Sequence, residues 1–358
     1  MLGFLISCSD QKTTDKSRYK NGNLIVFANT FEVIKDGENK RIHIINPESK
    51  TVEKYFLTKN TTTIIPKGYT SIKVPISSLI ALSGTHIGML SKINGISKIV
   101  GVSDKKYIFN TVLLKNINSG KVIDFGSESS IPFESIVKTN AQVLIYSGFG
   151  QQFPQNKQLL KMGTVCIPNY DWKENHPLGK AEWIKLFGCL IGKEKEATSY
   201  FNQIVKEYNT LKTKASKYEI SPSVFSGNLI GDIWYTPAGE SFTANQFKDA
   251  NADYIYAKTK GIGSIELSME KILTDNSNTK FWINPGASSI KELIKQNPKM
   301  NYFSAVKNKN VYCYSPKMNE FWELSAIEPQ HVLSDLIRIL HPNKQTNDPL
   351  YFYQNICQ

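Results

Sequence analysis

The stretch Lys193–Ser216, KEKEATSYFNQIVKEYNTLKTKAS, decides the fold. Its apolar residues recur at steps of three and four, and they are Ala197, Tyr200, Phe201, Ile204, Val205, Tyr208 and Leu211. This spacing predicts one apolar face on a helix, and no Gly or Pro interrupts it. At about 1.5 Å per residue, the helix would be about 36 Å long, the diameter of a small domain. We interpret it as a rigid helix between two α/β halves, although its periodicity fits a surface helix on one larger domain equally well.

Strand-like and helix-like segments alternate on both sides of this helix. On the N-terminal side, the β-branched run Ile72–Leu82 precedes a helical pattern over Thr85–Ile93 and a strand-like run at Ile99–Val102. On the C-terminal side, strand-like runs include Asp232–Tyr235 and Phe281–Asn284. Such alternation predicts parallel sheets. The expected fold class is therefore α/β, with two lobes of parallel-rich sheets joined by one long rigid helix and a ligand cleft between them.

The chain divides into five expected parts. They are a lipoprotein signal and tether at 1–22, an N-terminal β-meander at 23–71, an N-terminal lobe at 72–192, the bridging helix at 193–216 and a C-terminal lobe at 217–358. In the meander, strand-like runs are predicted at Leu24–Phe27, Arg41–Ile45 and Val52–Leu57. Turn residues such as Asp36 and Gly37 separate the runs.

The first residues, MLGFLISCSD, resemble a bacterial lipobox that ends at Cys8. The apolar run is too short to span a bilayer, and the polar tract Ser9–Asn23 after it has the composition of a tether. No Lys or Arg precedes the apolar run, which departs from the usual signal. We expect lipidation at Cys8; the alternative is a chance apolar N-terminus with an unmodified thiol.

Composition excludes several classes of function. The net charge is +12, but the chain of 358 residues has only three arginines, Arg18, Arg41 and Arg338. Its lysines are scattered rather than clustered, so we expect a solvated surface, not a nucleic-acid site. The cysteines after Cys8 form no CxxC pair, which argues against a zinc site or a dense disulfide framework. These cysteines are Cys166, Cys189, Cys313 and Cys357.

The usual motifs of catalysis and metal binding are absent. The sequence contains no GxxxxGK[ST] phosphate loop, no GxGxxG after a strand, no HExxH and no GxSxG. Its five histidines are spread along the chain without the spacing of metal ligands. We therefore expect a protein that is not an enzyme, has no cofactor of its own and supplies no metal site.

Aromatic residues follow several of the predicted strands. In open parallel sheets, ligands bind beyond the carboxyl ends of the strands, and large rings there suit a flat or bulky ligand. The predicted ligand-binding residues are His86, Tyr107, Phe149, Tyr170, Trp172, Trp234, Tyr235 and Trp322. For any single ring, packing in the core is an equally good interpretation.

Six segments in a fixed order resemble a known family. They are ALSGTHIGMLSKINGISKIVGVSD, PFESIVKTNAQVLIYSG, EWIKLFGCLIGKEKEATSYFNQIVKEY, ELSMEKILTDNSNTKFWIN, SAVKNKNVYCYSP and VLSDLIRILHP. Over Ile72–Pro342 the chain resembles the class III substrate-binding proteins of ABC importers, which carry ferric siderophores, haem and cobalamin. The resemblance implies two lobes bridged by a long helix, and an ABC permease in the inner membrane as partner. It also implies a monomer on the periplasmic side of the cell envelope.

The resemblance also implies docking residues and a kind of ligand. Glu134 and Glu270 match the glutamates, one on each lobe, that dock arginines of the permease. No Arg lies between Arg41 and Arg338, and an Arg-poor aromatic cleft favours a neutral or flat ligand. The expected ligands are cobalamin or another corrinoid, a hydroxamate siderophore, or haem; a lysine could still serve an anionic ligand. The metal would arrive chelated.

Two other classes of function stay open. One is a two-lobed transferase with its active site in the same cleft, for which a nucleotide-binding loop or an acid–base pair would be expected. The other is a lipid-anchored adhesion module, which would leave the aromatic strand ends unexplained.

Overall fold

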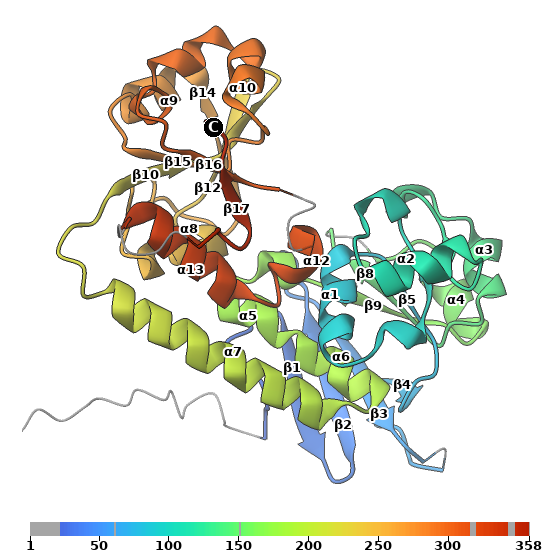
Figure 1. Cartoon of the computed structure of the whole chain (residues 1–358). Coiled ribbons are helices and arrows are strands. Elements are labelled where there is room, and N and C mark those ends of the chain that lie inside the picture. Colours follow the sequence, from blue (N-terminus) through green and yellow to red (C-terminus); the bar gives the residue numbers. More distant parts are fainter. Residues whose placement is uncertain (1–21, 61, 150–151, 316–319, 343–347, 358) are drawn as a thin grey trace, which may run out of the picture.

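The computed structural model describes residues 22–60, 62–149, 152–315, 320–342 and 348–357. Figure 1 shows two lobes joined by a long helix, with an additional small sheet beside the N-terminal lobe. The predicted lipoprotein signal and Cys8 lie outside the described residues.

The N-terminal lobe is built on a five-stranded parallel sheet with the order β7-β6-β5-β8-β9. Its strands are β5 Leu79–Ala81, β6 Ile99–Val102, β7 Ile123–Asp124, β8 Val143–Ser147 and β9 Val165–Asn169. Its helices are α1 Gly84–Lys92, α2 Thr111–Asn118, α3 Phe133–Lys138, α4 Asn156–Lys161, α5 Pro177–Glu182 and α6 Ile184–Ile191. Because all pairs are parallel, the carboxyl ends of the strands lie along one edge of the sheet.

The C-terminal lobe contains a mixed sheet with the order β13-β10-β15-β16-β17, in which only β17 runs antiparallel to its neighbour. Its strands are β10 Ser223–Ser226, β13 Asp253–Tyr254, β15 Phe281–Ile283, β16 Val311–Tyr314 and β17 Tyr353–Asn355. Its helices are α8 Phe242–Asp249, α9 Met269–Asn276, α10 Ile290–Gln296, α11 Ser304–Lys307, α12 Phe321–Leu324 and α13 Pro329–Leu340.

A second sheet in this lobe is antiparallel. It consists of β11 Asn228–Ile230, β12 Ile233–Pro237 and β14 Ser264–Ser268. The expectation that Asp232–Tyr235 belongs to a parallel sheet is therefore wrong. Gly231, with φ of 60°, forms a tight turn that folds β12 back onto β11.

Short 3-10 helices complete the two lobes. They are η1 Ile96–Lys98, η2 Lys105–Tyr107, η3 Glu128–Ser130, η4 Asp171–Lys173 and η5 Pro298–Tyr302.

Helix α7, Glu194–Ala215, is 22 residues long and connects the two lobes. Its buried residues include Ala197, Phe201, Ile204 and Tyr208, which lie on the face that the periodicity predicts. It packs against α6 on one side and α13 on the other, while the sheets of the two lobes share no strand. This architecture confirms the predicted fold class.

The additional sheet has the order β1-β2-β3-β4. Its strands are β1 Phe31–Asp36, β2 Asn39–Ile45, β3 Val52–Thr58 and β4 Thr70–Lys73. The predicted strand at Leu24–Phe27 is wrong: Leu24 donates its N–H to Val33 of β1, but the N–H groups of the residues after it bond to side chains. Val26, Phe27 and Ala28 donate their N–H groups to the buried carboxylate of Glu182, at 2.6–3.0 Å.

A second buried carboxylate holds the next two residues of the same loop. Glu174 accepts the N–H groups of Asn29 and Thr30 at 2.7 and 3.0 Å, and it also accepts the indole N–H of Trp183 at 3.2 Å. Trp183 packs on Phe31, the first residue of β1, with ring centroids 4.4 Å apart. The small sheet is therefore attached to the N-terminal lobe by hydrogen bonds and by packing.

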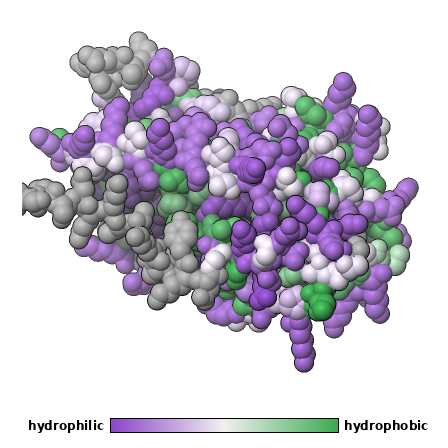
Figure 2. All heavy atoms as spheres, turned by 90° about the horizontal axis from the view of Figure 1, so that it is seen from below, coloured by the Kyte–Doolittle hydropathy of each residue, from purple (hydrophilic) through white to green (hydrophobic). Residues whose placement is uncertain are grey.

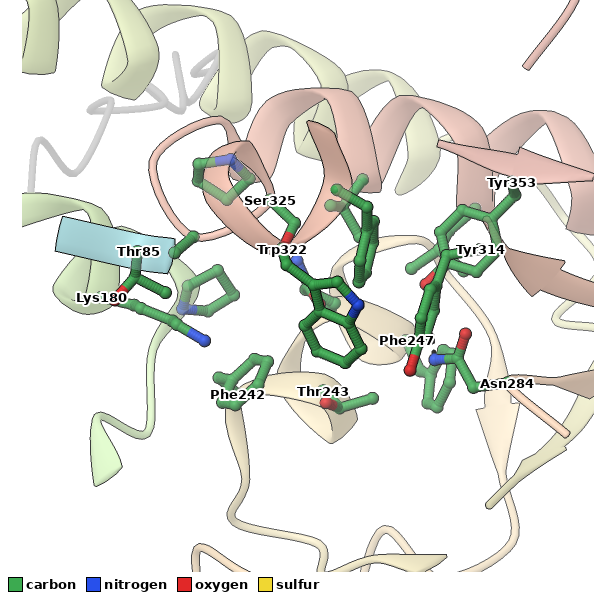
Figure 3. A pocket seen from close by; sticks show the side chains of 17 residues that line it. Thr85, Lys180, Phe242, Thr243, Phe247, Asn284, Tyr314, Trp322, Ser325 and Tyr353 are labelled. Atoms are coloured by element: carbon green, nitrogen blue, oxygen red, sulfur yellow. Dashed lines mark hydrogen bonds between the residues drawn. The ribbon is translucent and has the colours of Figure 1, made fainter. Parts of the chain in front are cut away.

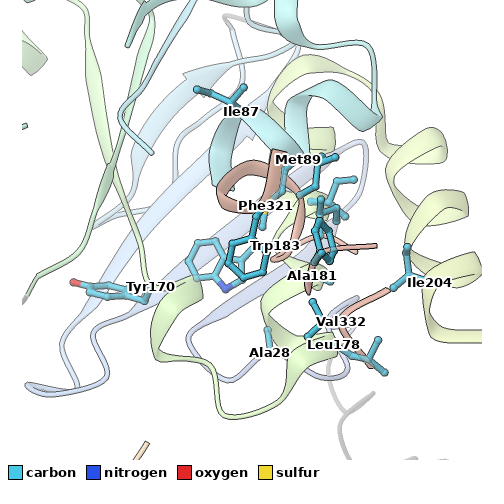
Figure 4. Close-up of a cluster of buried hydrophobic side chains, with 14 of the residues drawn as sticks. Ala28, Ile87, Met89, Tyr170, Leu178, Ala181, Trp183, Ile204, Phe321 and Val332 are labelled. Atoms are coloured by element: carbon cyan, nitrogen blue, oxygen red, sulfur yellow. The ribbon is translucent and has the colours of Figure 1, made fainter. Parts of the chain in front are cut away.

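The apolar core is continuous beneath the space between the lobes. Figure 4 shows side chains of one buried cluster that come from the N-terminal loop, α1, α5, α7, α12 and α13. Ala28, Trp183, Ile204 and Val332 all belong to this cluster. A shared core of this kind opposes large rotations of one lobe against the other.

The scattered lysines of the sequence predict a hydrophilic surface. The face drawn in Figure 2 is mostly hydrophilic, with hydrophobic residues scattered over it. Within the described residues, no helix combines the length and the apolar character that crossing a membrane requires.

Candidate ligand-binding cleft

A cavity of about 260 Å³ lies between the lobes. It lies where ligands bind in open α/β sheets: Tyr314 ends β16, Asn284 directly follows β15, and Thr85 lies in the first turn of the helix after β5. The lining residues are Thr85, Pro177, Lys180, Phe242, Thr243, Gln246, Phe247, Asn284, Tyr314, Phe321, Trp322, Ser325, Ala326, Pro329, Val332, Leu336 and Tyr353. Most of the lining is therefore apolar or aromatic.

All the aromatic rings of the cavity come from the C-terminal part of the chain, and we call them the aromatic wall. The wall consists of Phe242, Phe247, Tyr314, Phe321, Trp322 and Tyr353. The rings of Tyr314 and Phe321 are stacked with centroids 4.0 Å apart, and Trp322 meets Tyr314 edge-on at 5.0 Å. Burial raises the pKa of Tyr314 to about 12, so its phenol is neutral at physiological pH. Such a preformed surface suits the face of a flat ligand.

The opposite side of the cavity, which we call the polar wall, comes from the N-terminal lobe. It consists of Thr85, Pro177 and Lys180. The Lys180 ammonium lies 4.5 Å from the centroid of the Phe242 ring, across the cleft from its own helix. Burial lowers the pKa of Lys180, and the carboxylate of Asp171 acts in the opposite direction.

Helix α12 carries two rings of the aromatic wall but is anchored on the N-terminal lobe. The carboxylate of Glu323 accepts the N–H groups of Phe109 and Asn110 at 2.6 and 3.1 Å. A Cβ at Gly88 of α1 would lie 1.8 Å from the carbonyl oxygen of Glu323, so glycine is what allows this close approach. Burial raises the pKa of Glu323 to about 7. The position of Trp322 is therefore set by contacts with both lobes.

Of the eight predicted ligand-binding residues, only Trp322 lines this cavity. Trp234 is fully buried in the core of the C-terminal lobe, against Phe225 and Trp282, and donates its indole N–H to the carbonyl of Ser226. The prediction that Trp234 faces the cleft is corrected accordingly. A ring next to a strand can point into the core as readily as beyond the sheet.

Two further predicted residues are buried in the N-terminal lobe, away from the cavity lining. Tyr170 is buried, and its hydroxyl accepts a hydrogen bond at 3.1 Å from Asn46, which directly follows β2 of the additional sheet. His86 is buried beside Phe187, and desolvation lowers its pKa to about 4 despite the opposing charge of Asp171. The imidazole of His86 is therefore neutral and belongs to the core.

The remaining predicted rings lie outside the cavity lining. Phe149 is 70% exposed and packs on Trp172, with ring centroids 5.1 Å apart. Tyr107 is exposed on η2, and Tyr235 is half-buried on β12. The structure thus groups Phe149 with Trp172 at one edge of the N-terminal lobe but does not bring this pair together with Trp322.

Sequence reasoning missed most of the cavity. Tyr314 ends a predicted strand, so the criterion applied to the other rings would have found it. Tyr353 and Lys180 carry no such signal, because β17 follows the last predicted helix and Lys180 is one of many lysines. Only their positions in the folded chain bring them to the cavity.

The two predicted docking glutamates occupy equivalent places. Glu134 and Glu270 are each the second residue of a helix, α3 and α9, and both are exposed. Figure 1 places these helices at the outer ends of the two lobes. Glu270 forms an ion pair with Lys299 at 3.2 Å. A role in docking stays a prediction for both.

Neither a disulfide nor a metal-ligand cluster is present in the described part of the chain. Cys166, Cys189, Cys313 and Cys357 are free thiols. No group of three or more His, Cys, Asp or Glu side chains in these residues is placed to hold a metal ion.

Two α/β lobes, a connecting helix and a cavity between the lobes define a two-lobed binding protein. The periplasmic binding protein family matches residues 79–318, and the chain belongs to this family. This finding confirms the resemblance found in the sequence.

Individual proteins resemble the chain in sequence or in fold. An uncharacterized lipoprotein of Methanocaldococcus jannaschii is 28% identical to this chain, and the alignment covers 92% of this chain and 84% of that protein. A periplasmic haem-binding protein of Pseudomonas aeruginosa has a TM-score of 0.60 at 17% identity, covering 79% of this chain and 99% of that one. A periplasmic vitamin B12-binding protein of Vibrio cholerae has a TM-score of 0.54 at 14% identity, covering 76% and 99%. At these identities the solved structures support the fold alone.

Proposed function

We propose that the protein is the lipid-anchored substrate-binding component of an ABC importer. It captures a chelated-metal ligand (a corrinoid, a ferric siderophore or haem) and delivers it to the membrane permease. The observation that carries this proposal is the aromatic cavity between two lobes of a periplasmic binding protein fold. Two proteins of similar fold are a haem-binding and a vitamin B12-binding protein, which supports a metal chelate as cargo.

The protein acts by binding alone. The metal arrives already chelated, so the cleft needs to recognise the outer face of the complex and not the ion itself. The rings of Tyr314, Phe321 and Trp322 provide a surface for a flat or bulky chelate. The monomer presents Glu134 and Glu270 to basic residues of the permease, where exposed charges orient a partner more than they hold it.

A titration of the full chain tests the proposed cargo. Cobalamin, haem and several ferric siderophores are added in turn, and tryptophan fluorescence is followed. We expect saturable binding of at least one of them at a ratio of one to one, because Trp322 lies within reach of a coloured ligand that quenches it. The ligand recovered afterwards should be chemically unchanged. If none of the ligands in the panel binds saturably, the proposed function is contradicted.

Fractionation of cells tests the lipid anchor. The relative from Methanocaldococcus jannaschii is named a lipoprotein, which supports an anchor at Cys8 outside the cytoplasmic membrane. An acyl chain contributes about 0.8 kcal/mol per buried CH₂, so Cys8→Ser should release the protein from the membrane fraction. Cys357→Ser is the matched control and should leave the protein membrane-bound. Equal fractionation of the two variants would argue against lipidation at Cys8.

A further inference from the structure

Lys180 is the only charged side chain among the described residues that line the cavity. Figure 3 shows it on the same side as Thr85, facing the aromatic wall. The contact of its ammonium with the Phe242 ring, at 4.5 Å, adds some stabilisation. Such a contact leaves all three N–H donors of the ammonium free, because a ring face replaces neither an acceptor oxygen nor water.

No residue that the structure describes supplies an acceptor for this ammonium. None of the ion pairs closer than 4.0 Å and none of the side-chain hydrogen bonds within the described ranges includes the Nζ atom of Lys180. Asp171 is the carboxylate whose charge reaches Lys180, but it lies outside the cavity lining. Asp171 is itself buried, and its Oδ2 atom also lacks a partner.

A half-buried ammonium without an acceptor is unfavourable unless a ligand supplies one. Because the cavity offers a single positive charge and no negative one, it matches a ligand that presents one carboxylate there. A triply charged chelate would bring more negative charge than Lys180 can balance. Thr85 lies on the same wall, and its hydroxyl lies 3.2 Å from the hydroxyl of Ser83, so Lys180 is the group that the polar wall offers to a carboxylate.

We propose that the cargo is a metal chelate with a free carboxylate, which binds the ammonium of Lys180 while the body of the chelate packs on Trp322 and its neighbours. This inference rests on the proposed function and deepens it. In this arrangement the polar wall of the N-terminal lobe orients the ligand, and the aromatic wall makes most of the apolar contacts with it.

Matched pairs of ligands test the proposal, because the two members of a pair differ only in whether they carry free carboxylates. The pairs are haem and its dimethyl ester, a cobalamin monocarboxylic acid and cobalamin, and a ferric hydroxamate with a free carboxylate and its methyl ester. Each is titrated against the full chain, Lys180→Gln and Lys180→Arg. A hydrogen bond to a charged group changes affinity by about 10- to 100-fold. For the scaffold that binds, the carboxylate member should therefore bind wild type more tightly by that factor.

The variants identify the residue responsible for this preference. Lys180→Gln should make the two members of the pair bind equally, and Lys180→Arg should keep a preference for the carboxylate. Lys280→Gln is the matched control, because Lys280 also lies over a ring, Phe281 at 5.3 Å, but is exposed and outside the cavity. It should keep the full preference.

The outcomes separate this inference from the proposed function. Equal affinity of wild type for both members, or a preference that survives in Lys180→Gln, would overturn the role of Lys180 while leaving the binding protein assignment intact. Absence of binding by every ligand would remove the proposed function and this inference together. Circular dichroism establishes whether Lys180→Gln folds. If it does not fold, the affinities of wild type for the two members of each pair test whether the cleft prefers a carboxylate.

Discussion

The two lobes contribute different chemistry to one cleft. The aromatic wall of the C-terminal lobe brings six rings, whereas the polar wall of the N-terminal lobe brings Thr85, Pro177 and Lys180. The N-terminal lobe also has aromatic residues after its strands, but Tyr170 is buried and its hydroxyl is bonded to Asn46, which directly follows β2 of the additional sheet. An element added beside one lobe can thus engage a ring that would otherwise be free for a ligand.

Helix α12 connects the two walls. It carries Phe321 and Trp322 of the aromatic wall, yet Glu323 holds it to the N-terminal lobe through Phe109 and Asn110. Opening the cleft widely would break these hydrogen bonds and expose a buried carboxylate. The aromatic wall therefore depends on the opposite lobe for its position, and we expect only small closure on binding.

The largest effect is expected from Trp234→Ala, which tests the distinction between rings of the core and rings of the cleft. Trp234 is fully buried against Phe225 and Trp282, so its removal should lower the free energy of unfolding by about 3–5 kcal/mol. Urea denaturation followed by circular dichroism measures this change. A loss below about 1 kcal/mol would show that the ring is not part of a tightly packed core.

Trp322→Ala tests the aromatic wall itself. Trp322 is 43% exposed and lines the cavity, so the variant should bind cargo more weakly by about 2–4 kcal/mol. Its stability should change far less than that of Trp234→Ala. Calorimetric titration with the best ligand of the panel gives the affinity. Trp172→Ala is the comparison, because this ring lies outside the lining, and an equal loss there would move the ligand toward the edge of the N-terminal lobe.

Glu323→Gln tests the contact between the lobes through its pH dependence. The pKa of Glu323 is raised by burial from 4.5 to about 7, so the folded protein keeps a proton that the unfolded chain releases above pH 4.5. The free energy of unfolding should therefore fall as pH rises from 4.5 to 7, and this group contributes up to about 3 kcal/mol. Urea denaturation at several pH values should show a smaller fall in Glu323→Gln. Identical pH profiles would contradict this role.

The smallest effects on binding are expected at the outer ends of the lobes. Glu134→Ala and Glu270→Ala should leave cargo affinity unchanged and should have little effect on stability, because both side chains are exposed. Import through the cognate permease should fall in both variants, as measured by uptake of labelled ligand. If either variant abolishes cargo binding, the docking residues have been placed in the wrong part of the fold.

Local patterns in the sequence determine the architecture of the two lobes and of the helix that joins them. The buried face of α7, including Phe201, Ile204 and Tyr208, follows directly from the spacing of its apolar residues, because helical periodicity is a property of neighbouring residues. The alternation of strands and helices likewise indicated two α/β lobes. Local patterns do not encode long-range hydrogen bonds: the loop that contains Phe27 resembles a strand in sequence, but the N–H group of Phe27 bonds to Glu182, 155 residues away.

The site depended on tertiary structure for the same reason. Trp234 lies in a predicted strand and Trp322 follows the last predicted strand, and nothing in the neighbouring sequence tells the core ring from the cleft ring. Burial of Trp234 requires Phe303 and Trp282 from distant segments, and Lys180 reaches the cavity only because α5 packs beside Phe242 of α8. Sequence periodicity specifies which face of an element is apolar, whereas the packing of elements from distant parts of the chain decides which rings remain free for a ligand.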